Sequence, residues 1–345
     1  MTELASAFLG VMIVLQSVTL EPVFTVGEND GPPETTFGRV VDAVFDTEGV
    51  LLIVDASDAH IRRIDVSGQP TGMFGRSGRG PRELHRPVAA EWLDSTVAIT
   101  HSGTVSEFTT EGAFVDSWRL PGYGFSKAIP LDRERRAVLR AGVAGASSVD
   151  PRQIVSVIGA GEDVRLATGS SGGVFVRHET GSVAFDAGLC GTLSISYLGN
   201  GAFLIGNGRE GTVTRFEDAT EVRSYRVSPP AGPLPSEKKE EVASLLRRSS
   251  SLQRARSVEV MLPPYLSTVC GMEVEHSERV WVHVATEGDA EQWRALALGT
   301  GELSTRLDLP VNHRLLAAHD GRIAAAWETD LDVTRITVFR LRDEK

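Results

Sequence analysis

Histidine and cysteine are the side chains most able to bind a metal ion or attack a substrate, and this chain has eight histidines and two cysteines. None of the histidines shows the paired spacing of a strong metal motif, and neither a His-Glu-x-x-His helix nor a serine nucleophile elbow is recognised. Serine, histidine and aspartate are too common here for a catalytic triad to be inferred from their order. We therefore predict no catalytic residue, no protein-bound metal and no cofactor.

The two cysteines stand in similar settings. Cys190-Gly191 and Cys270-Gly271 recur about 80 residues apart, each near the start of a predicted innermost strand. Two cysteines exclude a disulfide scaffold and a four-cysteine zinc site. We expect two buried free thiols, because adjacent inner strands are too far apart for a bridge. A disulfide is the alternative if the chain is exported.

Short β-like runs bounded by glycine, aspartate or asparagine recur along the chain. Three pairs of residues match at a single offset of about 44 residues: Ile64 with Phe108, Gly68 with Gly112, and Phe74 with Trp118. Further units begin near residues 126, 193, 267 and 313. The pattern predicts an all-β fold over residues 21–345, a six-bladed β-propeller of four-stranded antiparallel blades. The strand Pro22–Val26 would complete the last blade and close the ring.

Basic side chains precede the innermost strands of this predicted propeller, where they would surround the mouth of its channel. They are Arg39, Arg86, Lys127, His313 and Arg314. In a protein of net charge −11, such a ring would attract a carboxylate, a phosphate or an acidic peptide segment. The alternative interpretation is that these are solvated residues that happen to precede strands.

The histidines divide unequally between the two faces of the predicted ring. His60, His101 and His283 fall in or beside loops between second and third strands, which share a face with the crossovers between blades. His276 and His319 map to the opposite face. Ligand binding by the first group is one interpretation. The tendency of polar residues to gather in longer loops is the other.

The stretch from Phe74 to Leu84, Phe-Gly-Arg-Ser-Gly-Arg-Gly-Pro-Arg-Glu-Leu, resembles the blade-joining loop of NHL-type six-bladed β-propellers. This resemblance is strongest over about residues 35–120, and His60 stands where that family usually carries arginine. The rhythm of the whole chain is similar to a group of exported bacterial six-bladed propellers. The resemblance implies a fold, and it implies little about activity, because propellers include both binding proteins and enzymes.

The glycines of the same loop permit positive φ angles where the chain leaves an outer strand. Glu83 can accept hydrogen bonds from backbone NH groups or pair with Arg76 or Arg79. No Gly-Lys-Ser/Thr ending follows, so a phosphate-binding loop is not predicted.

Enzymes that resemble this fold, such as the sugar-lactone lactonases, hold a divalent cation at the channel mouth through acidic and amide side chains. The matching positions of this chain are basic or neutral, whereas hard cations prefer carboxylates. Asp42 and Glu91 lie further along the same strands and supply two carboxylates. A metal-dependent, lactonase-like hydrolase or lyase with a divalent cation is therefore the alternative to a binding protein.

The segment 228–264 departs from the repeat. It opens with a run of four prolines in seven residues, which cannot form a central strand. Ser236 then provides an N-cap, and we predict a helix over residues 236–256 inserted between the fourth and fifth blades. Six basic and three acidic residues fall in this helix. The helix either lies on the propeller or forms an appendage that binds a partner.

The N-terminus carries an apolar run of about a dozen residues, from Leu4 to Leu15. This run is too short to span a bilayer and fits the hydrophobic region of a signal peptide. With Ser17 and Thr19 as the small residues of a cleavage site, we predict a signal peptide over residues 1–20 and a periplasmic or extracellular protein. A buried N-terminal strand or helix is the alternative.

Composition narrows the range of partners. The chain has 46 acidic and 35 basic residues, which argues against a nucleic-acid-binding surface. No other segment is long and apolar enough to anchor the chain in a membrane. We predict a non-catalytic binding or scaffold propeller that recognises a protein, a peptide or a small anionic ligand on its loop-rich face.

Overall fold

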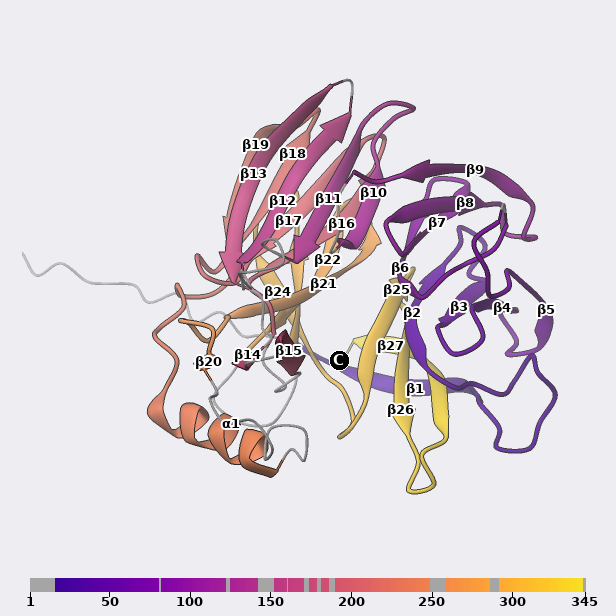
Figure 1. The fold of residues 1–345 in the computed structure, drawn as a ribbon. Coiled ribbons are helices and arrows are strands. Elements are labelled where there is room, and N and C mark those ends of the chain that lie inside the picture. Colours follow the sequence, from indigo (N-terminus) through magenta and orange to yellow (C-terminus); the bar gives the residue numbers. More distant parts are fainter. Residues whose placement is uncertain are drawn as a thin grey trace, which may run out of the picture.

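The computed structural model describes residues 16–80, 82–121, 125–141, 152–159, 161–170, 174–178, 181–185, 190–248, 259–285 and 292–343. These residues form an all-β structure with one short helix (Figure 1). Among them, no helix has the length and apolar character needed to cross a bilayer.

Four sheets contain four antiparallel strands each, and in every one the strands follow in chain order from one edge to the other. The first two sheets are β2 (Val40–Phe45), β3 (Leu51–Asp55), β4 (His60–Ile64) and β5 (Pro70–Phe74), then β6 (Pro87–Leu93), β7 (Thr96–His101), β8 (Thr104–Phe108) and β9 (Phe114–Arg119). The other two are β10 (Phe125–Pro130), β11 (Arg136–Ala141), β12 (Arg152–Gly159) and β13 (Glu162–Ser170), then β16 (Leu193–Gly199), β17 (Ala202–Asn207), β18 (Thr212–Glu217) and β19 (Thr220–Arg226).

A fifth sheet has eight strands and contains both ends of the described chain. Its order is β21 (Val269–His276), β22 (Arg279–Val284), β23 (Gln292–Ala297), β24 (Leu303–Asp308), β1 (Gln16–Val26), β27 (Thr334–Asp343), β26 (Arg322–Glu328) and β25 (Arg314–His319). The predicted pairing of the N-terminal strand with the C-terminal one is confirmed, because β1 runs antiparallel to β27. The strand is longer than predicted, since it begins at Gln16 instead of Pro22.

The prediction of six separate four-stranded blades differs from this topology. The structure has four separate four-stranded sheets and one eight-stranded sheet. The cause is the extra length of β1, which pairs in parallel with β24 through Gln16 and Ser17 and so merges two groups of four strands. The first strands β2, β6, β10, β16, β21 and β25 contact one another in a closed circuit, which makes the fold propeller-like.

The burial of each strand follows from its place in this circuit. Second strands such as β3 and β17 are buried along almost their whole length, because neighbouring sheets cover both of their faces. Outer strands such as β9 and β19 are mostly exposed. This explains why the second strands consist of near-continuous apolar runs, whereas the outer strands are rich in polar residues.

The sequence repeat has a clear packing basis at two turn glycines. A Cβ atom on Gly68 would lie 2.6 Å from the Phe24 ring, and one on Gly112 would lie 2.5 Å from the Phe74 ring. Both glycines also have positive φ angles, of +89° and +84°. Each turn therefore requires its glycine for two reasons. Glycine adopts the positive φ angle, and it leaves room for an aromatic side chain of the preceding outer strand.

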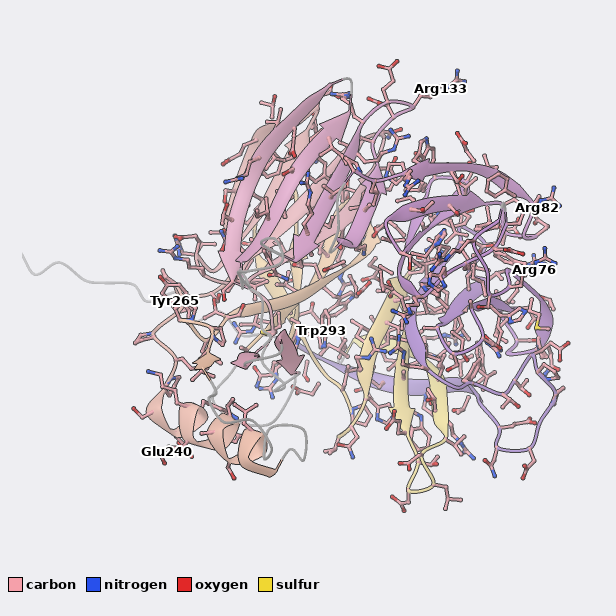
Figure 2. The ribbon with its side chains drawn as sticks, in the orientation of Figure 1. Arg76, Arg82, Arg133, Glu240, Tyr265 and Trp293 are labelled. Carbon is pink, nitrogen blue, oxygen red and sulfur yellow. A yellow bond between two sulfur atoms is a disulfide. The ribbon has the colours of Figure 1, made fainter. Side chains whose placement is uncertain are left out.

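The loop that resembles the NHL blade-joining segment is arranged in part as predicted. Glu83 accepts a hydrogen bond of 2.8 Å from the Gly80 NH group, and its carboxylate lies 2.9 Å from the Arg76 guanidinium. Gly75 has a φ angle of +81°, but Gly78 and Gly80 do not have the positive φ angles that were expected of them. Arg76 and Arg82 project from the rim of the molecule (Figure 2).

Two insertions join to form a small side sheet that the repeat pattern did not predict. The hairpin β14 (Val174–His178) and β15 (Gly181–Phe185) precedes β16, and β20 (Glu259–Met261) pairs antiparallel with β14. Helix α1 (Ser236–Arg248) begins where predicted, and residues 249–256 of the predicted helix lie outside the described residues. Glu240 on this helix points into solvent (Figure 2).

A disulfide between Cys190 and Cys270 links the segments that follow these two insertions, with a Cα–Cα distance of 5.2 Å. The expectation of two free thiols is therefore wrong. Cys190 precedes β16 instead of lying within it, so its backbone is not held at the spacing of two inner strands. The bridge closes a loop that contains a whole four-stranded sheet and helix α1.

Candidate functional site: a charged central cavity

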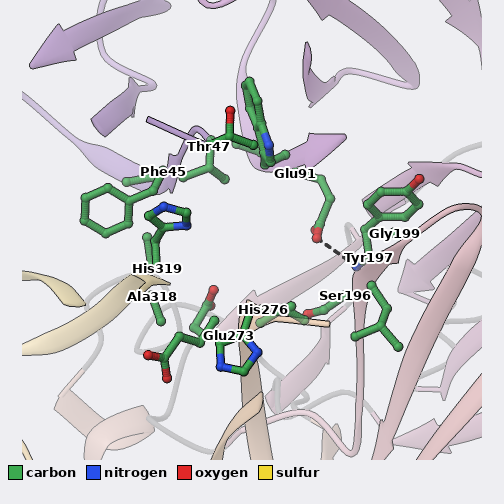
Figure 3. Close-up of a pocket in the computed structure, with 18 of the residues that line it drawn as sticks. Phe45, Thr47, Glu91, Ser196, Tyr197, Gly199, Glu273, His276, Ala318 and His319 are labelled. Atoms are coloured by element: carbon green, nitrogen blue, oxygen red, sulfur yellow. Dashed lines mark hydrogen bonds between the residues drawn. The ribbon is translucent and has the colours of Figure 1, made fainter. Parts of the chain in front are cut away.

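A cavity of about 340 Å³ lies where the first strands of the sheets meet. Figure 3 shows its walls, which come from β2, β6, β10, β16, β21 and β25. Exposed residues of the turns that follow these first strands form its rim, namely Thr47, Asp94, His276 and Ser277. The cavity therefore opens on the face of the molecule opposite the crossovers. The predicted basic ring belongs to the other face, that of the crossovers.

A recurring β-bulge determines which side chains face this cavity. Five first strands shift register against their second strands near their start: at Val40/Asp42, Pro87/Ala89, Phe125/Lys127, Val269/Gly271 and Leu315/Ala317. The shift places Asp42 and Lys127 at equivalent positions. Glu91 and Glu273 stand two residues beyond the equivalent position of their own strands, and residues two apart lie on one face. All four side chains therefore line the same space.

Both carboxylate oxygens of Glu91 are held in place. Its Oε1 atom accepts a hydrogen bond of 2.7 Å from the Tyr197 NH group, and its Oε2 atom lies 2.5 Å from the Lys127 Nζ atom. Burial alone would lower the pKa of Lys127, but the nearby carboxylates, Glu91 above all, raise it above the usual value. Lys127 is therefore a permanent ammonium at neutral pH.

Asp42 and Glu273 complete the charge cluster. Asp42 accepts hydrogen bonds from the Ala90 and Ala43 NH groups at 2.8 and 3.0 Å. Burial raises the pKa of Asp42, and the Lys127 charge opposes this effect. Burial raises the pKa of Glu273 well above its usual range, against the Lys127 charge, and the negative charges of Asp42 and Glu91 raise it further. Three carboxylates thus share one close ammonium.

Polar and aromatic side chains surround the cluster. Phe45, Trp92 and Tyr197 line the cavity together with His276 and His319. The Trp92 indole NH is buried without a hydrogen-bond partner. The Tyr197 hydroxyl donates to Asp94 at 3.0 Å. The walls therefore combine negative charge with flat aromatic surfaces, a combination that suits organic cations.

Glu275 also lines the cavity but has a structural role. Its carboxylate accepts hydrogen bonds from the Trp281 indole at 2.8 Å and from the Gly321 NH group at 2.7 Å. Arg279 lies 3.4 Å away. These contacts join β21, β22 and the β25–β26 turn, so both carboxylate oxygens are already in use.

The predicted basic ring is divided among several places. Lys127 reaches into the central cavity. Arg39 and Arg314 instead line a surface groove of about 530 Å³, together with Glu328 and Asp330. Arg314 donates hydrogen bonds to the Val40 and Val41 carbonyls at 3.1 and 3.3 Å. Its charge lowers the pKa of both Asp42 and Glu273, against the larger effect of burial.

Two members of that ring belong to neither space. Arg86 is exposed and has a φ angle of +54°. His313 stacks on Trp327 with 5.5 Å between ring centroids, and its Nδ1 atom lies 3.1 Å from the Val311 carbonyl. The five predicted residues therefore do not converge on one ligand.

The three predicted face histidines also lie apart. His101 is buried: its Nδ1 accepts from the His85 NH group at 3.3 Å, and its Nε2 lies 2.8 Å from the Ser106 hydroxyl. Burial lowers the pKa of His101 to about 4, so the ring is neutral and has no nitrogen left for a ligand. His283 stacks on Trp293 at 5.0 Å. His60 lies 3.3 Å from Asp58.

A buried arginine near His60 pairs with two aspartates of the turn that precedes β4. Arg62, two residues beyond His60, lies 3.2 Å from the buried Asp55 and 2.7 Å from Asp58. Asp55 also accepts hydrogen bonds from the Gly38, Arg39 and Ser57 NH groups. Arg62 therefore holds the turn that leads into β4, a structural role.

Among the described residues, no three His, Cys, Asp or Glu side chains are grouped so that they could hold a metal ion. Asp42 and Glu91, considered above as metal ligands, instead bind backbone NH groups and share Lys127. Contrary to the expectation above, a Gly-x-Ser-x-Gly pattern does occur, at 169–173, but it precedes strand β14, whereas a nucleophile elbow needs a helix there. Its last three residues lie outside the described part of the chain.

The sequence reasoning missed Glu273 and the histidines that line the cavity. Glu273 lies in the middle of β21, two residues beyond the position that follows its bulge, whereas the predicted channel residues stand at the starts of the first strands. The usable signal was the alternation Glu273-Val-Glu275-His276 at the end of one strand. His276 and His319 were correctly assigned to the face opposite the crossovers, on which this cavity opens, but they were not predicted to line a site.

Comparison with known proteins supports the fold alone. No protein-family model matches the chain, and no curated protein matches it. The structure is similar to a candidate exported protein of Bacteroides fragilis, with a TM-score of 0.58, 12% identity, and 97% of each chain covered. It is also similar to a member of the DUF4221 family from Bacteroides vulgatus, with a TM-score of 0.55, 10% identity, and 95% of this chain and 99% of that chain covered.

These similarities concern the fold and assign no activity to this chain. Virginiamycin B lyase of Staphylococcus aureus matches over 94% of this chain and all of its own, at 12% identity, but its TM-score of 0.45 is too low to support any argument. Membership of the NHL family is not shown by any of these comparisons and stays a prediction.

Proposed function

We propose that this chain is an exported, six-bladed β-propeller that binds a small cationic ligand in its central cavity and performs no chemistry on it. The observation that carries the proposal is the cavity itself, in which three carboxylates and several aromatic side chains face a space of about 340 Å³. That volume lies within the range of small-molecule sites.

The count of six blades follows if the eight-stranded sheet is divided at its parallel join. Strands β21 to β24 form one antiparallel group of four, and β25, β26, β27 and β1 form another. With the four separate sheets, this division gives six blades around the cavity. The circuit of contacts between the six first strands supports it.

Export is supported by two independent features. The Cys190–Cys270 disulfide is typical of oxidising compartments, such as the periplasm or the extracellular space. The apolar run from Leu4 to Leu15 has the length of a signal-peptide hydrophobic region.

The charge of the cavity favours a cation over the anion that the sequence alone suggested. Three carboxylates face it, from Asp42, Glu91 and Glu273, and that of Asp94 stands at its rim, against the single ammonium of Lys127. A buried excess of negative charge costs free energy unless protons or cations neutralise it. An organic cation supplies that charge and also contacts the aromatic walls.

The carboxylates are held in ways that suit binding better than catalysis. Glu91 and Asp42 keep backbone hydrogen bonds, so their oxygens are fixed in place before any ligand arrives. Pre-organised groups bind a ligand without the cost of ordering them. We place a metal-dependent hydrolase or lyase second, because the described residues offer no set of three converging metal ligands.

The experiment compares three probes of similar length and different charge: 1,4-diaminobutane, 1,4-butanediol and succinate. Thermal unfolding is followed with each at millimolar concentration. We expect the diamine alone to raise the Tm, by about 2 °C or more at well above its Kd. The exposed rim residue Thr47 gives a blocking variant, Thr47→Trp, and the exposed Ser67 on an outer hairpin gives the control, Ser67→Trp.

Loss of the diamine effect in Thr47→Trp but not in Ser67→Trp supports binding in the cavity. Equal shifts in all three proteins would place the diamine elsewhere and contradict the proposal. A shift with succinate that Arg39→Ala removes would instead favour the surface groove of Arg39 and Arg314.

A further inference from the structure

The N-terminal strand β1 contains residues that the predicted signal peptide would remove. That prediction covers residues 1–20, with Ser17 and Thr19 as the small residues of the cleavage site. In the structure, Gln16 to Leu20 are the first five residues of β1. A cut after Thr19 or Leu20 would therefore remove part of a sheet.

These five residues pair on both edges. Val18, Thr19 and Leu20 pair with Asp343, Arg342 and Leu341 of β27. Gln16 and Ser17 pair in parallel with Thr305 and Arg306 of β24. The second pairing joins the two halves of the eight-stranded sheet, so Gln16 and Ser17 connect the last group of strands to the group before it. Without them, β24 would present an unpaired edge over this stretch.

Two of these five residues, Val18 and Leu20, also contribute to the apolar core. Val18 is 7% exposed and belongs to a cluster with Trp281, Trp293, Leu307, Leu315 and Phe339. Leu20 packs against that cluster. Trp281 and Leu307 lie on β22 and β24, so Val18 reaches across the join to the neighbouring group of strands. Loss of Val18 would leave a cavity between the two groups.

We infer that the mature, folded protein retains Gln16 to Leu20, so that any peptidase cut lies before Gln16. Ser17 and Thr19 are strand residues of the ring and not a cleavage site. Cleavage before Gln16 would leave every described pairing of β1 in place. The inference rests on the proposed export for its biological setting, but its structural basis is independent of it.

The first test is the N-terminus of the full chain, expressed in a bacterial host and recovered from the periplasm or medium. Intact mass and N-terminal sequencing should give a first residue at or before Gln16. A mature chain that begins after Gln16 and melts at the same temperature as the full chain would overturn the inference. Full-length protein confined to the cytoplasm would contradict the proposed export but not the inference about β1. In that case the two truncated chains described below test the inference.

The second test is a pair of truncated chains, one beginning at Gln16 and one at Glu21, each after an initiating methionine. We expect the first to melt like the full chain and the second to lose about 5 °C or more in Tm. Equal Tm values for the two would overturn the inference.

Point variants keep the test valid if the shorter chain does not fold. Val18→Ala should lower the Tm by several degrees, whereas the same change at an exposed position of β1, Val23→Ala, should change it by less than about 1 °C. No difference between the two variants would show that the packing of β1 at Val18 contributes nothing, contrary to the inference.

Discussion

The ammonium of Lys127 lies 2.5 Å from one carboxylate oxygen of Glu91, while the other oxygen of Glu91 binds the backbone NH of Tyr197. These residues stand on β10, β6 and β16, so one carboxylate links three sheets at the centre of the ring. It also explains why β6 contacts β16 although β10 lies between them in the chain.

Removal of the ammonium should therefore destabilise the ring. Lys127→Met leaves Glu91 buried without its partner, and loss of one member of a buried ion pair costs about 3–5 kcal/mol. Urea unfolding at pH 7 measures the change. Arg86→Met removes an exposed cation near the same strands and should cost less than about 0.5 kcal/mol. Similar costs for both variants would contradict the structural role of Lys127.

The ion pairs of Arg62 with Asp55 and Asp58 should stabilise the fold, and the neighbouring Arg63 provides a control. Arg62 is 2% exposed and pairs with Asp55 and Asp58, so Arg62→Met should cost about 3–5 kcal/mol. Arg63 lies 4.0 Å from Glu111, which is well exposed, and Arg63→Met should cost less than about 1 kcal/mol. Denaturant unfolding compares the two. The account of the β4 turn fails if Arg63 matters as much as Arg62.

His101 makes stability depend on pH. Its pKa falls from about 6.5 in the unfolded chain to about 4 in the folded one, because burial disfavours the charged ring. Below pH 6.5 the unfolded state binds more protons, so stability decreases as the pH falls toward 4, by about 3 kcal/mol in total. His101→Asn should remove this part of the pH dependence between pH 7 and 4.5.

The measurement for His101 is the difference in unfolding free energy between wild type and variant at each pH. The control is His276→Asn, which changes an exposed histidine. A difference that stays constant from pH 7 to 4.5 in His101→Asn would show that the buried ring does not titrate as described.

The disulfide should contribute to stability. Reduction, or the double change Cys190→Ser and Cys270→Ser, should cost about 2–4 kcal/mol because it frees a long loop in the unfolded chain. Thermal unfolding with and without a reductant is the measurement. The double variant should melt at the same temperature under both conditions. A wild-type Tm that a reductant leaves unchanged would contradict a stabilising bridge.

The all-β, propeller-like character of the fold was predictable because its signals are local, whereas the merging of two groups of strands through β1 was not. Turn glycines such as Gly68 and Gly112 recur about 44 residues apart along the chain, and each contacts an aromatic side chain of another sheet, Phe24 and Phe74 respectively. The side sheet was not predictable, since β14 and β20 come from different insertions and pair across a long stretch of chain. The disulfide depends on that same long-range arrangement.

The site was harder to predict for a different physical reason. Arg39 and Arg314 were assigned to the channel mouth because they stand at the starts of first strands, whereas the cavity is lined by residues further along those strands, such as Glu273. Where the side chains of six first strands converge depends on how the sheets pack together. Asp42, Glu91 and Lys127 were identified from the sequence, but not the contact between Lys127 and Glu91. Whether a cavity is positively or negatively charged depends on which side chains converge on it. The sequence of a single chain does not show which side chains converge.

The most direct test of the account is a calorimetric titration of 1,4-diaminobutane into wild type and into Glu273→Gln at pH 8. Glu302→Gln, which removes an exposed carboxylate in a distant turn, is the control. The account predicts binding to wild type and to Glu302→Gln, with affinity at least about tenfold weaker in Glu273→Gln, because that variant loses one of the charges that hold the cation. Equal affinity in all three proteins, or no binding to any, would contradict a cation site in the central cavity.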